Sequence, residues 1–420
     1  MKYKISHPSK TLRGNITLTA SKSESNRALI IQALCSEIFT INNLAAANDT
    51  AVLQNILKTA QKPAAERVYN VEDAGTAIRF LTAFFATQPG THTLLCSEGM
   101  KVRPIGILVE ALRSLGAKIE YLEKPGFPPL KITGTTLSGT EVEIDGNVSS
   151  QFISALLLIA PRLPNGLVIK FKGEVTSRPY INMTLKMMEE FRVYGQWHDA
   201  HISVSKQNYH KKNEPGYQFE VEADWSSASY WYAIAALARD ADFIIKGLKH
   251  PSLQGDAIVA DLFTFFGIKT DYIEGGVHLT KTPSKKEHFS FDFSDCPDLA
   301  QTVAVVASAT GIPMLCNGVH TLRIKETDRI EALKKELQKL NVEVLVNNDN
   351  SIEIIPKVSE AHQIITINTY NDHRMALAFA SLAMKYDHII IDQPEVVKKS
   401  YPDFWKDLKS VGFIIEELQS

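Results

Sequence analysis

The chain has 420 residues, of which 45% are hydrophobic and 22% are charged, and its formal net charge is −2. This length exceeds one ordinary hydrophobic core, so two domains of a globular protein are expected. The low net charge argues against a general nucleic-acid binder. Residues 1–10 lack the apolar core of a signal peptide, no apolar run approaches a membrane span, and the four cysteines are widely spaced, so we expect a reduced, cytoplasmic protein without a cysteine-based metal site.

The order of apolar and polar residues predicts one supersecondary unit that recurs six times. Each copy has a short strand that ends in small polar residues, a buried apolar helix, a second strand, a linker, an amphipathic helix and a further strand or strand pair. The expected strands are 15–19, 40–43, 93–97, 118–121, 141–144, 167–171, 219–222 and 388–391. The expected helices are 48–59, 78–85, 105–115, 152–160, 181–191, 230–238, 258–266, 302–309, 327–340, 375–384 and 404–409.

The starts of the buried helices show the period of this unit. Thr76, Ser150, Ser227, Asp298 and Asp372 follow one another at intervals of 74, 77, 71 and 74 residues, whereas Glu24 precedes Thr76 by only 52. Such a period is typical of stacked structural repeats, and coincidental spacing of ordinary βα turns is the alternative. If the repeat is real, several helix N-termini could meet at a central cleft and bind an anion there.

The segment SKSESNR at 21–27 precedes the apolar residues 28–34 and predicts the capped start of a buried helix. Lys22 and Arg27 lie at this N-terminus, where the helix dipole already favours anions. They indicate a phosphate or carboxylate site, although a purely structural helix start has the same pattern. Further cations recur near the other helix starts, namely Arg79, Arg103, Arg178, Arg323, Lys325, Arg329, Arg374, Lys398 and Lys399.

The densest polar segment is RIKETDR at 323–329. Thr327 is expected to cap the helix over 327–340, with Glu326 just before it and Arg329 in its first turn. A carboxylate among cations is a candidate acid or base, and a surface salt bridge is the alternative for Glu326. His373 could act in acid–base chemistry, bind a metal, or do neither. No metal motif and no Gly-rich phosphate loop accompanies these residues, so neither a metal nor a nucleotide is expected.

With these residues in view, the chain resembles the 5-enolpyruvylshikimate-3-phosphate synthase family over nearly its whole length. The resemblance rests on motifs in the family's order: SKSESNRA (21–28), AGTAIR (74–79), RPIG (103–106), DGNVSSQF (145–152), SRPY (177–180), SSASY (226–230), LQGD (253–256), PDLA (297–300), RIKETDR (323–329), YNDHRMA (370–376) and SYPDFW (400–405).

The resemblance implies the enolpyruvyl transferase fold, an α/β fold of two similar domains, each with three βαβαββ repeats around buried helices. A discontinuous domain would comprise 1–20 and 224–420, on the Asp298, Glu326 and Arg374 side of the active-site cleft. The inserted domain, 21–223, would lie on the Lys22, Arg103 and Ser149 side. This arrangement agrees with the six repeats.

The resemblance also implies the reaction and its residues. The enolpyruvyl group of phosphoenolpyruvate would pass to the 5-hydroxyl of shikimate 3-phosphate through a tetrahedral intermediate, with release of phosphate and without a metal or organic cofactor. Asp298, Glu326 and Lys22 would handle protons. The residues implied for shikimate 3-phosphate are Lys22, Ser23, Arg27, Ser149, Ser150, Gln151, Ser177, Asp298 and Lys325. Those implied for phosphoenolpyruvate are Lys22, Gly75, Arg103, Gln151, Arg329, Arg374 and Lys399.

The chain departs from the family's pattern at a few positions. Asp73 and Phe80 stand where the family usually has Asn and Pro, and Thr321 stands where it usually has Asn. The first repeat is short, with a truncated link over 60–67. Because Asp73 and Phe80 would lie beside the phosphoenolpyruvate pocket, we expect weaker phosphoenolpyruvate binding and altered sensitivity to glyphosate.

Two other functions are alternatives for this sequence. A related transferase acts on UDP-N-acetylglucosamine and usually carries a Cys or Asp in a mobile loop shortly before the arginine that matches Arg103. Here Cys96 lies seven residues before Arg103, at the end of an expected strand, and the SSQ and SRPY segments fit a sugar-nucleotide site poorly. A non-catalytic protein that binds shikimate-type anions is the other alternative. The expected partners are small-molecule substrates, with no nucleic acid and no membrane, and the chain is expected to be a monomer.

Overall fold

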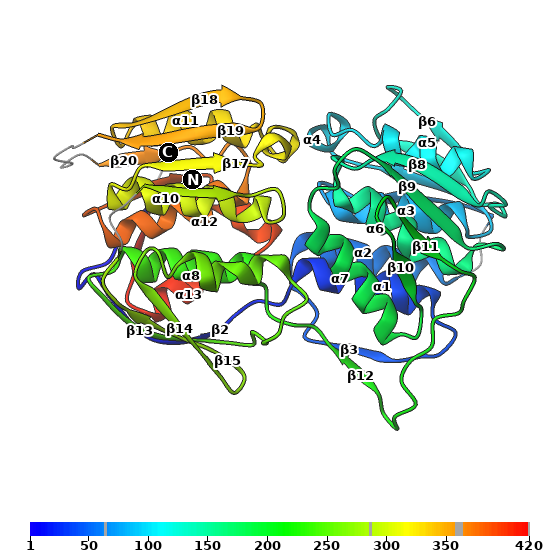
Figure 1. Ribbon diagram of the computed structural model, residues 1–420, viewed down its shortest axis with the longest axis horizontal. Coiled ribbons are helices and arrows are strands. Elements are labelled where there is room, and N and C mark those ends of the chain that lie inside the picture. Colours follow the sequence, from blue (N-terminus) through cyan, green and yellow to red (C-terminus); the bar gives the residue numbers. More distant parts are fainter. Residues whose placement is uncertain (63–64, 285–287, 358–363, 419–420) are drawn as a thin grey trace. The chain divides into compact units, whose positions relative to one another are not determined.

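The computed structural model describes residues 1–62, 65–284, 288–357 and 364–418 (Figure 1). The chain divides into two compact units, which we call the first unit (Met1–Ala20 with Glu222–Ser420) and the second unit (Ser21–Val221). The chain therefore passes from one unit to the other twice. Among the helices of the described residues, none has the length and apolar character needed to cross a membrane.

The described part of the first unit contains three four-stranded sheets with one pairing pattern. In each sheet two parallel strands form one half, and two further strands continue it in antiparallel pairing. The sheet orders are β2-β13-β15-β14, β16-β17-β19-β18 and β20-β21-β1-β22. The bounds are β1 Lys2–Ser6, β2 Thr11–Thr17, β13 Asp240–Lys246, β14 Ile268–Ile273, β15 Gly276–Lys281, β16 Phe289–Asp292, β17 Met314–Asn317, β18 Val342–Asn348, β19 Ser351–Pro356, β20 Ile365–Ile367, β21 Ile389–Asp392 and β22 Ile414–Leu418.

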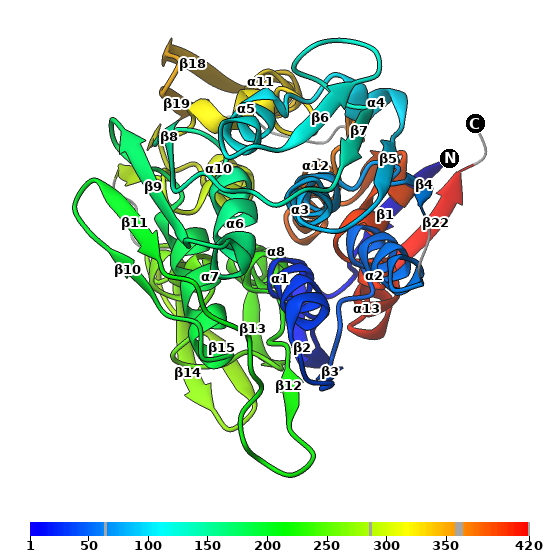
Figure 2. The same cartoon turned by 90° about the vertical axis from the view of Figure 1, so that its right-hand side faces the viewer.

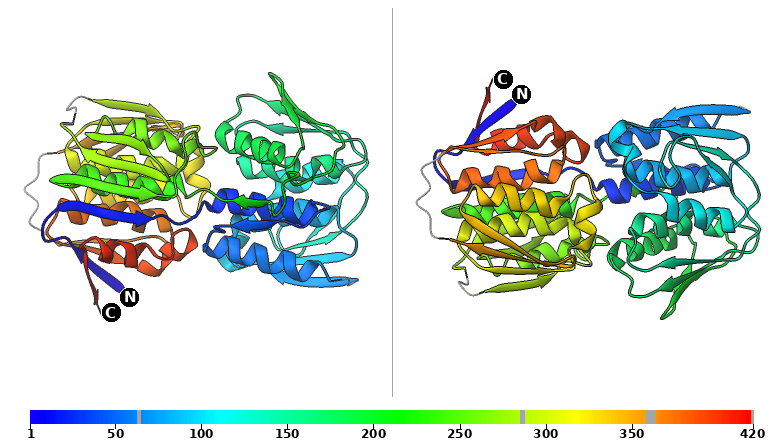
Figure 3. Two further views of the ribbon diagram at one scale, coloured as in Figure 1. Left: turned by 90° about the horizontal axis from the view of Figure 1, so that it is seen from below. Right: turned by 90° about the horizontal axis from the view of Figure 1, so that it is seen from above.

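The pairing of β1 with β22 brings the first and last strands of the described chain together, as Figure 3 shows. β2 also pairs with a strand from the C-terminal half, because it lies parallel to β13 with Thr11 opposite Asp240. The N-terminal strands therefore complete sheets whose other strands come from the C-terminal half of the chain.

Three buried helices lie side by side in the first unit: α8 (Trp225–Leu237), α10 (Ala300–Thr310) and α12 (His373–Ala380) (Figure 1). Every residue of α8 is buried, because apolar side chains surround the helix, its serines are small, and its two tyrosine hydroxyls have hydrogen-bond partners. The remaining helical segments are α9 Val259–Leu262, α11 Arg329–Gln338, α13 Phe404–Ser410, η2 Gly255–Ile258, η3 Pro297–Leu299, η4 His320–Ile324, η5 Ser381–Met384 and η6 Pro394–Lys399.

The second unit repeats this design around α1 (Lys22–Leu34), α3 (Gly75–Ala86) and α6 (Ser150–Ile159), which Figure 2 shows nearly end-on. Two sheets, β4-β5-β7-β6 and β8-β9-β11-β10, have the pattern described above. The other bounds are β3 Thr40–Asn42, β4 Glu66–Asn70, β5 Thr91–Leu95, β6 Lys118–Tyr121, β7 Leu130–Thr133, β8 Glu141–Asp145, β9 Leu167–Lys172, β10 Gly195–Trp197, β11 His201–Val204, β12 Gln218–Glu220, α2 Asn48–Ala60, α4 Glu98–Lys101, α5 Gly106–Ser114, α7 Arg178–Glu190 and η1 Ala160–Arg162.

The short interval of 52 residues between Glu24 and Thr76 corresponds to a sheet of two strands in the described chain. β3 and β12 pair in parallel, and in the described chain no antiparallel strands extend this pair. Since α2 ends at Ala60 and β4 begins at Glu66, the link between them is too short for a hairpin like that of β6 and β7. Residues 63 and 64 of the expected link lie outside the described residues.

Three local expectations were wrong. Asp328, not Thr327, caps α11, because its carboxylate accepts from the backbone N–H groups of both Ile330 and Glu331 at 3.1 Å. α8 begins at Trp225 with Asp224 as its cap, which places Ser226 and Ser227 inside the helix. The expected helix over 258–266 is only α9, preceded by the turn of η2.

Candidate functional site

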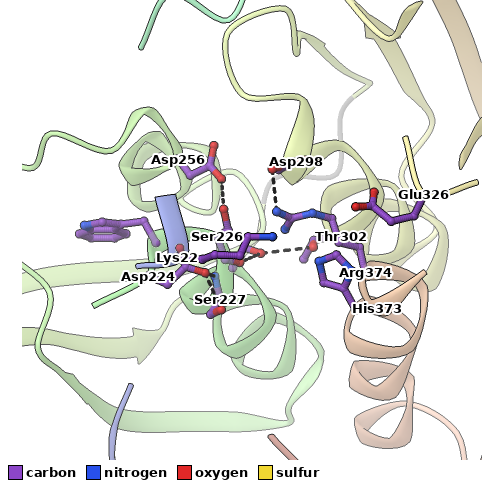
Figure 4. A network of polar contacts seen from close by, with 12 residues as sticks. Lys22, Asp224, Ser226, Ser227, Asp256, Asp298, Thr302, Glu326, His373 and Arg374 are labelled. Atoms are coloured by element: carbon purple, nitrogen blue, oxygen red, sulfur yellow. Dashed lines mark hydrogen bonds and ion pairs between the residues drawn. The ribbon is translucent and has the colours of Figure 1, made fainter. Parts of the chain in front are cut away.

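The first unit gathers charged side chains where α10, α11 and α12 begin, and Figure 4 shows several of them pointing toward one another. Asp298 lies in η3, directly before α10, and Glu326 precedes α11. Arg374 lies in the first turn of α12, whose cap is Asp372. Three helix starts therefore place carboxylates and guanidinium groups within hydrogen-bonding distance.

Arg329 is the centre of this cluster. Its side chain is 1% exposed and donates to Asp372 at 2.6 Å, to Glu326 at 2.9 Å and to Asp298 at 3.1 Å. Burial acts to lower the pKa of Arg329, but the three carboxylates outweigh it and raise that pKa above its ordinary value. Arg329 is therefore a permanent cation that holds three acidic side chains in place.

Arg374 contacts Asp298 from the other side. Its Nη2 donates to Asp298 Oδ2 at 2.6 Å, and its Nη1 donates to the hydroxyl of Tyr230 at 2.9 Å. Burial acts to raise the pKa of Asp298, but the charges of Arg374, Lys325 and Arg329 outweigh it and hold that pKa well below its usual range. Without a ligand, Asp298 is a carboxylate between two guanidinium groups.

Two lysines complete the cluster. Lys399 Nζ lies 3.4 Å from Glu326 Oε1, so Glu326 stands between Lys399 and Arg329. The pKa of Lys325 is lowered, chiefly by burial, although Asp298 opposes this effect. The arrangement suits the binding of small anions and the movement of protons between neighbouring groups.

Sequence reasoning missed two residues of this cluster. Asp256, in η2, is 2% exposed and accepts a hydrogen bond from Ser226 Oγ. Burial, helped by the charge of Asp298, raises the pKa of Asp256 to about 7. Tyr230 is fully buried in α8 and accepts from Arg374. Asp256 and Tyr230 lie in two motifs of the resemblance, LQGD and SSASY. The signal for their role is chemical, because a carboxyl or phenol group needs a hydrogen-bond partner when it is buried.

The second unit holds the other expected residues at the starts of its buried helices. Lys22 is in the first turn of α1, and its Nζ lies 3.8 Å from Asp49 Oδ2. Arg27 lies one turn later and is 2% exposed. It donates to the carbonyl oxygens of Ser23 and Tyr180 at 2.8 and 3.1 Å, and to the hydroxyls of Thr184 and Ser154 at 2.7 and 3.0 Å.

Phe80 lies against Arg27. The guanidinium carbon is 5.6 Å from the centroid of the Phe80 ring, and the ring is 1% exposed. Burial lowers the pKa of Arg27 to about 10. Phe80, which stands where the family usually has Pro, is therefore packed against a guanidinium group of α1.

The expected serines occur at two helix starts. Ser149 caps α6 and accepts from the backbone N–H of Gln151, while Ser150 is the first residue of that helix. Ser177 directly precedes α7 in a left-handed conformation, with φ of 55°, and is buried.

Gly75 and Arg103 approach each other closely. A Cβ atom added to Gly75 would lie 2.7 Å from Arg103 Nη1. Nearby, Asp73 accepts a hydrogen bond from Ser97 Oγ, and Ser97 caps α4. The carboxylate that replaces the family's asparagine is therefore engaged with the segment that leads to Arg103.

The structure thus brings Asp298, Lys325, Glu326, Arg329, Arg374 and Lys399 into one cluster. It places Lys22, Ser23 and Arg27 on α1, Gly75 and Arg103 in contact, and Ser149, Ser150 and Gln151 at the start of α6. His373 is 1% exposed, and its Nδ1 lies 3.6 Å from Asp372 Oδ1. In the described residues no group of three or more His, Cys, Asp or Glu side chains is arranged to hold a metal ion.

Comparison with known proteins identifies the family. A family model described as EPSP synthase (3-phosphoshikimate 1-carboxyvinyltransferase) matches residues 6–408. The chain belongs to the EPSP synthase family. A 3-phosphoshikimate 1-carboxyvinyltransferase of Bacteroides fragilis is 47% identical over 417 residues, which cover 99% of both chains. One from Sulfurovum is 37% identical and covers 96% of this chain and 98% of its own.

Solved structures bear on the fold. EPSP synthase from Acinetobacter baumannii has a TM-score of 0.78 at 19% identity, covering 99% of this chain and 100% of that one. The enolpyruvyl transferase NikO from Streptomyces tendae has a TM-score of 0.77 at 14% identity, covering 100% and 99%. The expected α/β enolpyruvyl transferase fold is therefore confirmed.

Proposed function

We propose that this EPSP synthase family member transfers the enolpyruvyl group of phosphoenolpyruvate to the 5-hydroxyl of shikimate 3-phosphate, in the shikimate pathway of aromatic amino acid biosynthesis. The observation that carries the proposal is the carboxylate of Asp298 held between Arg329 and Arg374, in a chain whose named relatives are 3-phosphoshikimate 1-carboxyvinyltransferases. Both substrates carry a phosphate and a carboxylate, which guanidinium groups bind well.

The chemistry has two stages. Asp298 accepts the proton of the 5-hydroxyl while that oxygen bonds to C2 of phosphoenolpyruvate, and an acid delivers a proton to C3, which gives a tetrahedral intermediate. A base then removes a proton from C3 as the C2–O bond to phosphate breaks, so the double bond re-forms and phosphate leaves. Glu326 and Lys22 are the proposed groups for the proton transfers at C3.

The arginines also account for how a weak base could act. Before substrates bind, Arg374 and Arg329 hold Asp298 ionised, which makes it a poor proton acceptor. Substrate anions that share these guanidinium groups weaken the two ion pairs, and the pKa of Asp298 then rises toward that of an ordinary carboxyl. Basicity would therefore develop when phosphoenolpyruvate is in place.

The remaining residues are proposed as ligands of the two substrates. For shikimate 3-phosphate we propose Lys22, Ser23, Arg27, Ser149, Ser150, Gln151, Ser177, Asp298 and Lys325. For phosphoenolpyruvate we propose Lys22, Gly75, Arg103, Gln151, Arg329, Arg374 and Lys399. A monomeric state, a cytoplasmic location and weaker phosphoenolpyruvate binding remain predictions from the sequence.

The experiment measures phosphate release by the purified protein with shikimate 3-phosphate and phosphoenolpyruvate, and with each omitted in turn. We expect release only when both are present, and a loss of release in Asp298→Ala that is not explained by unfolding. A folded protein that releases no phosphate would contradict the proposal. UDP-N-acetylglucosamine as acceptor then tests the related transferase, and binding of shikimate 3-phosphate without turnover would favour a non-catalytic protein.

A further inference from the structure

Arg79 is the cation of the AGTAIR segment, and the proposed reaction gives it no role. It lies on α3 and is 5% exposed. Its Nη1 donates a hydrogen bond to Oε1 of Gln151, in the first turn of α6. Its guanidinium carbon also lies 5.1 Å from the ring centroid of Phe152, the neighbour of Gln151. α3 and α6 pack against each other, so the contact joins two buried helices.

This contact determines which way the Gln151 carboxamide is turned. A guanidinium group has N–H donors and no acceptor, so the amide atom that faces Arg79 must be the oxygen. The amide NH2 group is on the other side of the planar carboxamide. In the described part of the chain no group accepts a hydrogen bond from this NH2, although Gln151 is only partly exposed.

The contact between Arg79 and Gln151 is restrained from two sides. The stacking of Arg79 on Phe152 restrains the guanidinium group, and the cap at Ser149 restrains the backbone of Gln151. A carboxamide free to turn could present either an acceptor or donors to a ligand. A carboxamide restrained in this way presents its NH2 donors on the side away from Arg79.

We propose that Arg79 is a positioning residue that turns the Gln151 carboxamide so that its NH2 group binds an oxyanion, the phosphate or carboxylate of a substrate. Arg79 acts through Gln151 and touches no substrate. The inference rests on the proposed function for the identity of the oxyanion, but the orientation of the carboxamide does not depend on it.

The substrate arm of the test uses steady-state phosphate release. Arg79→Met should raise the KM of shikimate 3-phosphate or phosphoenolpyruvate by roughly tenfold, the equivalent of about 1.4 kcal/mol of binding, with a smaller change in kcat. Arg113→Met is the matched control, because Arg113 also stacks on an aromatic ring, that of Tyr121, and donates to a neighbouring segment of the same unit. It should leave both KM values unchanged.

A double variant separates positioning from direct binding. If Arg79 acts through Gln151, then Arg79→Met adds nothing to the KM of Gln151→Met. If the KM increases multiply, Arg79 contacts the substrate itself and the proposal is overturned. Unchanged KM values in Arg79→Met would overturn it as well.

The orientation is tested without any substrate. Gln151→Glu keeps an oxygen toward Arg79 and replaces a hydrogen bond between a cation and a neutral amide with an ion pair, so the melting temperature should stay the same or rise. The same change in the Arg79→Met background should lower it. An equal decrease in both backgrounds would refute the orientation. If the unsubstituted protein releases no phosphate, the proposed function and the substrate role of Arg79 fall together, while this arm still decides the orientation.

Discussion

Arg374 Nη2 lies 2.6 Å from Asp298 Oδ2, and this ion pair joins the start of α12 to the start of α10. The side chain of Arg374 is 8% exposed and that of Asp298 is 21% exposed, so the pair is only partly screened by water. The position of this guanidinium group therefore contributes to the pKa of the proposed base. The hydroxyl of Tyr230 helps to hold Arg374 in place, because it accepts a hydrogen bond from Arg374 Nη1.

Tyr230→Phe removes the acceptor of Arg374 Nη1. A buried donor left without its partner costs about 1–3 kcal/mol, so Arg374 should become less well positioned and kcat/KM should fall by roughly tenfold. Tyr232→Phe is the matched control, because Tyr232 is on the same helix but its hydroxyl contacts Thr270. Phosphate release by the two variants checks this, and equal losses in both would contradict it.

Gly75→Ala tests the approach of Arg103. The new Cβ would lie 2.7 Å from Arg103 Nη1, and the guanidinium group can move away because it is the end of a flexible side chain. We therefore expect a folded protein whose KM for phosphoenolpyruvate rises severalfold, while its KM for shikimate 3-phosphate changes less. In Gly99→Ala the nearest atom, Asp73 Oδ1, would be at 3.4 Å, so this variant should behave like the original chain. A KM for phosphoenolpyruvate that stays unchanged in Gly75→Ala would argue against Arg103 as a ligand.

Asp256 should make stability depend on pH. Its ordinary pKa is 3.8, and in the folded protein burial and the charge of Asp298 raise that pKa to about 7. Between these values the folded state binds more protons than the unfolded state, so the free energy of unfolding falls as pH rises from about 4 to about 7. Ser226, Asp298, Asp224 and Arg374 are among the polar groups that act on Asp256.

Asp256→Asn removes this titration. The melting temperature of the variant, relative to that of the original chain, should therefore be higher at pH 8 than at pH 5. Thermal unfolding at the two pH values measures the difference. A difference that does not change with pH would show that Asp256 is ionised at both values.

Cys96 tests the alternative reaction with UDP-N-acetylglucosamine. Burial raises the pKa of its thiol to about 11, so at pH 7.5 less than about 0.1% is thiolate. Cys96→Ser should therefore keep kcat/KM within about threefold, and Cys96 should react slowly with iodoacetamide in a Cys35→Ser background. A large loss of activity in Cys96→Ser would instead assign the thiol to the chemistry.

Much of the architecture was predictable because it depends on neighbours in the chain. Buried helices were expected at 78–85, 152–160 and 302–309, and the structure has α3, α6 and α10 there. Apolar runs and capping residues act within a few positions, so a sequence displays them directly. The errors are equally local, since Thr327 and Asp328 are both good caps and only the geometry of the turn shows which one reaches the free N–H groups.

Residue order alone predicts the family motifs, the buried apolar helices and the cations near several helix starts. Which of these groups meet depends on how the chain folds. Arg329 contacts Asp298 and Asp372, which lie 31 and 43 residues away, and Asp256 reaches Ser226 across 30. The physical reason is that ion pairing and pKa depend on distance and burial in three dimensions, and neither follows from residue order.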